Sequence, residues 1–548
     1  LGSPHLDSRP SRGPKAEVLR RLAEPAISAR VPDIDDAEAI LVLGTDPMHS
    51  MSILDLRIRK AIRRNGAKLV VATERPTSLD GGAEAIARYA PGQAAHFVAE
   101  LASAIGGAEN VASPVAETLR DAGKVVVVWG ERIGREDGAA EALLDVAAAV
   151  GMADSDGSGL LEVPDTANAR GLREAGCLPD AGPGLAETAT GMSTEEIRDG
   201  LISGEISSLI LFGVDPLRDF PDTKAWETAL TACDFLVAFS MHENATTAKA
   251  DVVLPLETHA EKDGTVTHPD GRLQRVRPSA SRPGDIRPNI QVLAELAAKL
   301  DLDTDITSQP TAFAALTEAV PFYAGITDSD IGGRGLRWQD RQGASSEDDG
   351  TEHSGPQGAT EEEGRGPTET GATSQPGYVE AGDTPAHHAG KGDASESTET
   401  VAEGSPDTER DAPISMVQPE PTPGGVASGG SSATVPPPQG EGDSLLLGTY
   451  RDLWAGPVTE LNPPLRFLTP QQRLEISPAD AARLDLESGD PVRVSQNGSA
   501  VDARVQVKER VSEGVVFLAE GLLDGNANAL LNGGPVQVRI EKLGEARS

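Results

Sequence analysis

The stretch Ile40-Leu41-Val42-Leu43-Gly44-Thr45-Asp46-Pro47 decides the fold of this chain, because its pattern returns about a third of the chain later. The second copy is Leu209-Ile210-Leu211-Phe212-Gly213-Val214-Asp215-Pro216, and each copy is an apolar run that stops at Gly-x-Asp-Pro. Such a run is typical of a strand buried on both faces, as in a parallel sheet. Glycine permits a sharp exit, proline cannot continue the ladder, and aspartate can cap a following helix. The repeat therefore predicts two related α/β units.

The loop that ends each copy is a candidate binding site, because open α/β sheets bind ligands at the carboxyl ends of their strands. The residues that would form these loops are Gly44, Asp46, Gly213 and Asp215. Whether the loops still bind anything is the functional question.

Further strands and helices follow both copies in alternation. After the first copy we expect a helix over 50–64, with Met51, Leu54, Ile58 and Ile62 on one face, and a parallel strand over 68–72. The other expected strands are 124–129, 234–239 and 251–255, and the other expected helices are 138–150, 223–231 and 289–300. Ser193 and Glu196 have the spacing of a capping box, which predicts one more helix start there.

Charge and composition exclude several classes of protein. The net charge of −38 argues against nucleic-acid binding, because phosphate contacts need clustered Lys and Arg. The only cysteines are Cys177 and Cys233, which excludes a disulfide scaffold and a four-cysteine iron–sulfur site on this chain alone. No apolar run approaches bilayer-spanning length, so we expect no direct membrane insertion.

The last third of the chain changes character twice. Residues 341–443 contain 20 acidic and 4 basic residues and few apolar ones, so we expect 339–443 to be a disordered acidic linker. Short strands joined by tight turns such as Asn497-Gly498 then predict a small β-barrel over 444–548.

One run of motifs resembles the molybdopterin oxidoreductase family. It consists of Lys249-Ala250-Asp251-Val252-Val253-Leu254-Pro255, then Glu261-Lys262-Asp263-Gly264-Thr265, then Gly271-Arg272-Leu273-Gln274. The resemblance implies a body of two interleaved parallel-sheet α/β units over 1–338 and a C-terminal double-psi β-barrel over 444–548. It covers nearly the whole chain except the linker.

Within the family, the chain is most similar to the branch formed by the large G subunit of NADH-quinone oxidoreductase, respiratory complex I. Leu56-Arg57-Ile58-Arg59-Lys60-Ala61 and Gly213 to Asp222 carry that similarity. It implies the C-terminal portion of such a subunit, a structural part that supports electron transfer from NADH to quinone and has no catalytic site of its own. The implied partners are the cluster-bearing subunits of the complex, on the cytoplasmic side of the bacterial inner membrane.

Departures from the family pattern decide what we expect of cofactors. Cys177 and Cys233 lack the surroundings of a molybdenum ligand, and Thr73-Glu74-Arg75-Pro76 stands where pterin-binding relatives commonly have Asp-Pro-Arg. We therefore expect no cofactor and no metal on this chain, the iron–sulfur clusters belonging to the rest of the complex. Gly44, Asp46, Gly213 and Asp215 would then be remnants of a binding site.

Two alternatives stay open at this point. The first is a molybdopterin-dependent dehydrogenase of the formate dehydrogenase type, which would hold a molybdenum cofactor. The second is an interaction protein whose acidic linker binds a basic partner.

Overall fold

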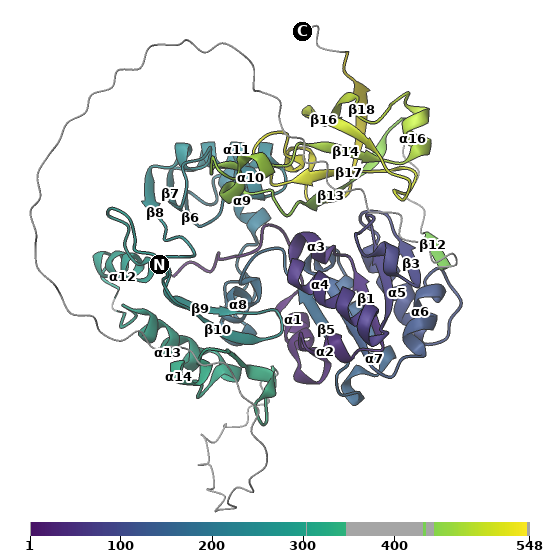
Figure 1. Cartoon of the computed structure of the whole chain (residues 1–548). Coiled ribbons are helices and arrows are strands. Elements are labelled where there is room, and N and C mark those ends of the chain that lie inside the picture. The colour runs from purple at the N-terminus through teal and green to yellow at the C-terminus, as the bar shows by residue number, and fades with distance from the viewer. Residues whose placement is uncertain (1, 303, 347–430, 435–442, 545–548) are drawn as a thin grey trace, which may run out of the picture. The chain divides into compact units, whose positions relative to one another are not determined.

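The computed structural model describes residues 2–302, 304–346, 431–434 and 443–544 (Figure 1). The first copy of the repeat lies in a six-stranded sheet with the order β12-β3-β2-β1-β4-β5, in which every pair is parallel. Its strands are β1 (Ala39–Leu43), β2 (Lys68–Thr73), β3 (Ala85–Arg88), β4 (Val125–Gly130), β5 (Gly159–Val163) and β12 (Ser431–Thr434). All five residues of β1 are fully buried, as the apolar run predicted.

Helices cover both faces of this sheet (Figure 1). One face packs on α5 (Ala94–Ile105), α6 (Ser113–Arg120) and α7 (Ala139–Val150). The other face packs on α2 (Asp33–Asp36) and α4 (Ser52–Lys60). Two apolar layers therefore hold the carboxyl ends of the strands in fixed positions.

The helix expected over 50–64 is divided in the structure. It consists of α3 (Pro47–Ser50), α4 and a π-helical turn over Ala61–Asn65. Met51 separates α3 from α4 because its backbone leaves the helical region, with φ −143° and ψ 72°. The turn ends at Gly66 in the left-handed conformation, as a C-terminal cap requires.

The second copy of the repeat lies in a smaller parallel sheet with the order β6-β7-β8. Its strands are β6 (Ser208–Phe212), β7 (Phe235–Ser240) and β8 (Val252–Pro255). Helices α9 (Thr194–Ser203) and α11 (Thr223–Ala232) cover the face of this sheet that carries Leu209, Leu211 and Leu236.

The opposite face of this sheet is exposed in the described part of the chain. Ile210, Phe212 and Phe235 are 46%, 42% and 48% exposed. The prediction of a strand buried on both faces is therefore correct for β1 and wrong for β6.

A third, antiparallel sheet was not expected from the sequence. It joins β9 (Gly264–Thr267), β10 (Arg272–Val276) and β11 (Leu336–Arg337), and Leu273, Tyr323 and Trp338 form its core. The expected helix over 289–300 is α12 (Asn289–Lys299), and α13 (Gln309–Ala319) follows it.

The edges of the predicted linker belong to ordered structure. Gln339 is buried, and the Ser346 hydroxyl donates to Glu24 and to the Arg20 carbonyl. Strand β12 pairs with β3. The rest of the predicted disordered linker, 347–430 and 435–442, lies outside the described residues.

The C-terminal part is a closed barrel, as predicted, with the order β13-β17-β14-β16-β15-β18. Its strands are β13 (Leu445–Arg451), β14 (Arg473–Ile476), β15 (Pro491–Gln496), β16 (Ser499–Val507), β17 (Val515–Glu520) and β18 (Val536–Lys542). The sheets and the barrel belong to one compact unit. None of the helices in the described ranges has the length and apolar character that a bilayer crossing requires.

Candidate functional site

A cavity of about 230 Å³ lies where the carboxyl ends of β1, β2 and β4 meet barrel strand β13. Residues at or after these four strand ends, and after β3 and β5, line it, among them Gly44, Asp46, Glu74, Arg75, Tyr89, Arg132, Glu136, Asp165, Tyr450 and Arg451. The position agrees with the rule that open α/β sheets bind ligands at the carboxyl ends of their strands.

Two of the four predicted binding residues line this cavity. Gly44 has φ +62°, and a side chain there would stand 2.5 Å from Ile133, so the position requires glycine. The Asp46 carboxylate accepts a hydrogen bond of 3.3 Å from the Met48 N–H and caps α3, as predicted. The first loop therefore forms one wall of the cavity.

The other two predicted residues do not line the cavity. Gly213 and Asp215 lie at the carboxyl end of β6, and the structure does not bring them to Gly44 and Asp46. Asp215 was expected to cap the next helix, α10 (Pro216–Asp219), and it does not. Its carboxylate instead accepts a hydrogen bond from the Thr246 hydroxyl, which fastens the loop to the segment after β7.

Arg75, at the end of β2, is held by the barrel. Its guanidinium donates two hydrogen bonds of 2.7 and 2.8 Å to Glu475 on β14 and lies 3.8 Å over the Tyr450 ring. Burial alone would raise the pKa of Glu475, but Arg75 and Lys508 hold that pKa at about 2. The Arg75 charge is therefore neutralised within the protein.

Arg132, after β4, is neutralised in the same way. It donates to Asp165 at 3.2 Å, to the Thr449 carbonyl at 3.3 Å, and to Glu520 at the end of β17. Burial would raise the pKa of Glu520, but Arg132 and then Arg451 hold it below its usual range. Arg451 lies 3.9 Å from Glu520 and also donates to the Asp165 carbonyl.

The N-terminus of helix α5 faces the cavity, and an internal carboxylate already bonds its N–H groups. The Glu136 side chain accepts from the Ala95 N–H at 3.1 Å. Burial raises the pKa of Glu136, and the N–H groups of Ala95, Ala94 and Gly92 oppose that shift.

Glu74 and Tyr89 differ from the other polar groups of the cavity. Burial and then the nearby Glu136 raise the pKa of Glu74 to about 7, against the opposing effect of Arg132 and the Gly92 N–H. Tyr89 is 2% exposed, and burial followed by Glu74 and Glu136 raises its pKa well above the usual value. These two groups have no ion-pair partner in the described part of the chain.

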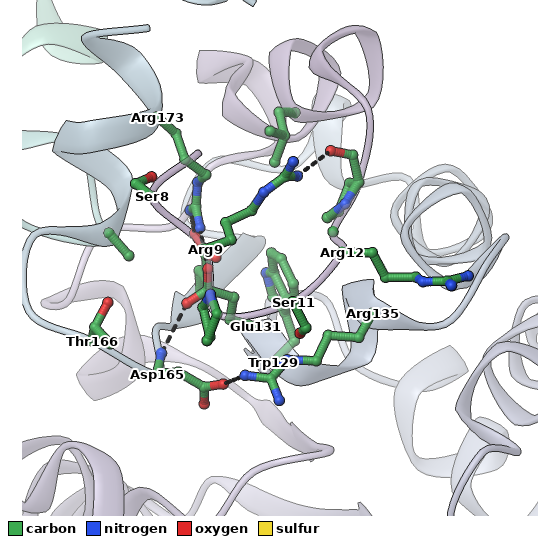
Figure 2. Close-up of a pocket in the computed structure, with 16 residues that line it drawn as sticks. Ser8, Arg9, Ser11, Arg12, Trp129, Glu131, Arg135, Asp165, Thr166 and Arg173 are labelled. Atoms are coloured by element: carbon green, nitrogen blue, oxygen red, sulfur yellow. Dashed lines mark hydrogen bonds and ion pairs between the residues drawn. The ribbon is translucent and has the colours of Figure 1, made fainter. Parts of the chain in front are cut away.

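A second, smaller cavity adjoins Asp165 (Figure 2). Its volume of about 20 Å³ holds about one water molecule. Figure 2 shows Arg135 reaching toward Asp165, whose N–H donates to Glu131, and Arg173 also donates to Glu131 at 2.6 Å. Internal ion pairs line this cavity, so we assign it a structural role.

The described residues do not gather metal ligands. Among them, no three His, Cys, Asp or Glu side chains lie in an arrangement that could hold a metal ion. Cys177 and Cys233 are both free and half-buried, and burial raises the pKa of each thiol. They are therefore not the low-pKa thiolates that soft metals prefer.

Sequence reasoning missed Tyr89, Arg132 and Glu136. Arg132 and Glu136 follow β4 as Asp46 follows β1, so the strand-end rule applied to β4 would have found them. The barrel partners Glu475 and Glu520 carry no comparable signal, because they are hundreds of residues from the side chains they neutralise.

Family comparisons agree with this architecture. Residues 15–299 match the family model Molybdopterin oxidoreductase, and residues 445–538 match the Molydopterin dinucleotide binding domain. The first match covers more than half of the chain. The chain belongs to the molybdopterin oxidoreductase family.

Individual relatives are subunits of redox enzymes. The chain is 26% identical to NADPH-Fe(3+) oxidoreductase subunit alpha of Geobacter sulfurreducens, over 99% of this chain and 61% of that protein. It is 31% identical to the G subunit of NADH-quinone oxidoreductase from Streptomyces coelicolor, over 44% of this chain and 30% of the relative. It is 23% identical to F420-dependent formate dehydrogenase subunit alpha of Methanocaldococcus jannaschii, over 92% of this chain and 75% of the relative. The chain thus spans less than two thirds of the first two relatives.

A solved structure shares the fold. Acetylene hydratase from Pelobacter acetylenicus superposes with a TM-score of 0.60 over 96% of this chain and 81% of that chain, at 12% identity. The expected architecture of parallel-sheet α/β units and a C-terminal barrel is confirmed.

The family's cofactor can be tested against the cavity. A dinucleotide brings phosphates, which proteins hold with free arginines and open helix N-termini. Here Arg75, Arg132 and Arg451 each face carboxylates of this chain, and Asp46 and Glu136 occupy the N-termini of α3 and α5. The residues that line the cavity do not fit the phosphates of a pterin dinucleotide.

Proposed function

We propose that this chain is a structural subunit of a multi-subunit NAD(P)H oxidoreductase, corresponding to a portion of the G subunit of NADH-quinone oxidoreductase. Its part in electron transfer is positional, since a folded body keeps the redox partners at fixed distances and excludes water between them. Its similarity to NADPH-Fe(3+) oxidoreductase subunit alpha over 99% of the chain, and to the G subunit of NADH-quinone oxidoreductase over 44% of the chain, supports this function.

One observation carries the proposal. The groups that would hold cofactor phosphates are already neutralised by Asp46, Glu136, Asp165, Glu475 and Glu520 of the chain itself. Removing such a carboxylate from water is costly unless it is paired, so these pairs stabilise the folded chain without a cofactor. A body that keeps the family fold in this way serves as a scaffold.

The partners and the location follow from the same proposal. The partners are the cluster-bearing subunits of the complex, and the chain holds neither a cluster nor a pterin. It is placed at the cytoplasmic side of the bacterial inner membrane through those partners. Gly44, Asp46, Gly213 and Asp215 are then loop residues that have a structural role.

A molybdopterin-dependent dehydrogenase of the formate type is the second candidate. The match to the Molydopterin dinucleotide binding domain favours it, as does the similarity to formate dehydrogenase subunit alpha over 92% of the chain. It requires the cavity to accept an anionic dinucleotide in spite of its paired arginines.

Purification of the native complex tests the two candidates. We expect oxidation of NADH or NADPH with a quinone or ferric acceptor, no formate oxidation, and molybdenum, tungsten and pterin all far below one per chain. Stoichiometric molybdenum or tungsten with a fluorescent pterin oxidation product would decide for the dehydrogenase. Comparison of quinone with ferric citrate, and of NADH with NADPH, assigns the substrates.

A further inference from the structure

Helix α4 and the π-helical turn after it carry one exposed stripe of apolar and basic side chains. The members of the stripe follow one another at helical spacing and are Ile53, Leu56, Lys60, Arg63 and Arg64. Ile53 and Leu56 are 76% and 61% exposed, and Ile53 is the most exposed large apolar side chain among the described residues. The opposite face of α4 packs on the sheet, so the stripe faces away from the core.

The basic end of the stripe is not neutralised in the part of the chain that the structure describes. Residues 47–68 contain six basic residues and one acidic residue. Three of the cations pair with carboxylates of the chain, Arg57 and Lys60 with Asp35 and Arg59 with Asp55. The other three, Arg63, Arg64 and Lys68, are exposed and have no ion-pair partner within the described ranges. The surface is therefore cationic, although the net charge of the chain is −38.

More apolar side chains lie beside the start of this stripe. Met48 on α3 is exposed, and its neighbour His49 accepts a hydrogen bond of 3.2 Å from the Leu453 N–H. This bond places the exposed side chains of Leu453 and Trp454 next to α3. Exposed Trp, Leu and Ile side chains together with Lys and Arg are typical of helices that lie in the interface of a bilayer.

The negative net charge of the chain does not oppose such a contact at short range. At physiological ionic strength the Debye length is about 8 Å, so carboxylates elsewhere on the body are screened from a bilayer that touches α4. Each Lys or Arg close to an anionic bilayer strengthens binding about fivefold, and three unpaired cations strengthen it about a hundredfold.

The apolar half of the stripe favours a bilayer over an acidic protein. A bilayer accepts Ile53 and Leu56 between its headgroups, while the long basic side chains reach the phosphates. A strongly acidic protein surface offers the opposite charge but no apolar layer for these two side chains.

We propose that the stripe on α4 binds the surface of a bilayer that contains anionic phospholipids. Ile53 and Leu56 lie among the headgroups, and Arg63 and Arg64 contact the phosphates. The helix lies on the bilayer and does not cross it. This contact goes beyond the proposed function, in which only the partner subunits hold the chain at the membrane.

Vesicle flotation of the full chain, purified with any partner subunits that accompany it, tests this proposal. The vesicles consist of phosphatidylcholine alone or of phosphatidylcholine with phosphatidylglycerol. We expect binding to the anionic vesicles to be at least about tenfold tighter, and we expect this preference to be lost at about 0.5 M salt. The neutral vesicles measure adsorption through other apolar surfaces of the chain.

Two variants and a control locate the contact. Arg63→Gln with Arg64→Gln removes two exposed cations and should weaken binding to the anionic vesicles by about tenfold or more. Ile53→Gln removes the most exposed apolar group and should weaken it by about tenfold. Arg277→Gln with Arg334→Gln removes two exposed arginines outside α4 and should bind like the native chain. Thermal melting of each variant shows that it folds, and Ile53→Gln still tests the proposal if the double variant does not fold.

Three results would overturn the proposal: equal binding to the two kinds of vesicle, no binding to either, or unchanged binding by both variants. Loss of a partner subunit from the variants, without any vesicle binding by the native complex, would assign the stripe to an acidic protein instead. None of these results bears on the scaffold role, which the metal and pterin content of the native complex tests.

Discussion

The surroundings of Glu74 determine the pH at which its carboxyl group becomes charged. It follows a buried strand, shares its cavity with Glu136, and has a pKa of about 7 in the folded protein. An unfolded glutamate has its ordinary pKa near 4.5. Between these values the folded chain binds the Glu74 proton more tightly than the unfolded chain does. The Glu74 contribution to stability is therefore complete below about pH 4.5 and is lost as the pH rises to about 7.

Replacing Glu74 by Gln should remove this pH dependence. We expect the melting temperature of Glu74→Gln to equal that of the native chain near pH 4.5 and to exceed it by about 1–2 °C at pH 8, because the variant buries no charge. Scanning fluorimetry across this range, with Glu84→Gln as the control, measures the difference. A constant difference at all pH values would contradict the assigned pKa.

Arg132 should matter more to stability than an exposed arginine. Arg132→Ala removes the nearest cation of Glu520, which keeps only Arg451 at 3.9 Å, and one of the two arginines that bond Asp165. Breaking a buried pair in this way costs about 3 kcal/mol. The control is Arg493→Ala, which breaks an exposed pair with Asp502 and should leave the free energy of unfolding nearly unchanged. Urea denaturation of the three proteins measures both values, and equal losses would contradict the structural role of Arg132.

At the scale of elements, short local patterns predicted what local residues determine. The apolar runs of β1, β2 and β4 and the Ser193 capping box of α9 all appear in the structure, as does the turn at Asn497 and Gly498, both with positive φ. Each depends on neighbours within one strand, helix or turn.

Elements that depend on distant partners were not predictable in this way. The β10 strand pairs with β11 more than sixty residues later. Its own residues Arg272–Val276 show neither an apolar run nor a strict alternation of polar and apolar residues. The burial of β6 was mispredicted because an apolar sequence shows that a face can be covered and does not show what covers it. Likewise, only part of the candidate site was predictable from the sequence. The loops at the strand ends were predicted, but the barrel carboxylates that neutralise the arginines of the site were not.

Helix α10 and the barrel are joined by one arginine. Arg218 donates to Glu460 at 2.9 Å and to the Gly521 carbonyl at 2.9 Å, and both side chains are buried. Arg218→Ala should lower stability by about 3 kcal/mol and speed proteolytic cleavage in the segment 452–468, because Glu460 loses its cation. Arg287→Ala, which breaks an exposed pair with Glu295, is the matched control. Cleavage mapping by mass spectrometry would contradict this account if both variants were cut alike.

At the scale of the whole molecule, charge is unevenly divided. Residues 341–443 carry a net charge of −16, out of −38 for the chain. Most of these acidic residues lie in 347–430, outside the described residues. The acidic linker therefore stays a prediction that a substitution can test.

Replacing 354–426 by a Gly/Ser segment of equal length should leave the melting temperature within about 1 °C, because a stretch so poor in apolar residues contributes little to a core. The variant should also elute earlier from an anion exchanger. A control that keeps the acidic residues and shuffles their order should behave like the native chain. A fall of several degrees in the Gly/Ser variant alone would show that the segment stabilises the body.

The uncovered aromatic face of the β6-β7-β8 sheet has a practical consequence for handling this polypeptide alone. Ile210 and Phe212 on β6 and Phe235 on β7 form an exposed apolar surface that can adsorb to columns, detergents and other copies of the chain. A recombinant sample should increase the fluorescence of an environment-sensitive dye, and its apparent molecular mass should rise as the protein is concentrated. The isolated chain should therefore self-associate more readily than a chain in which this face is covered.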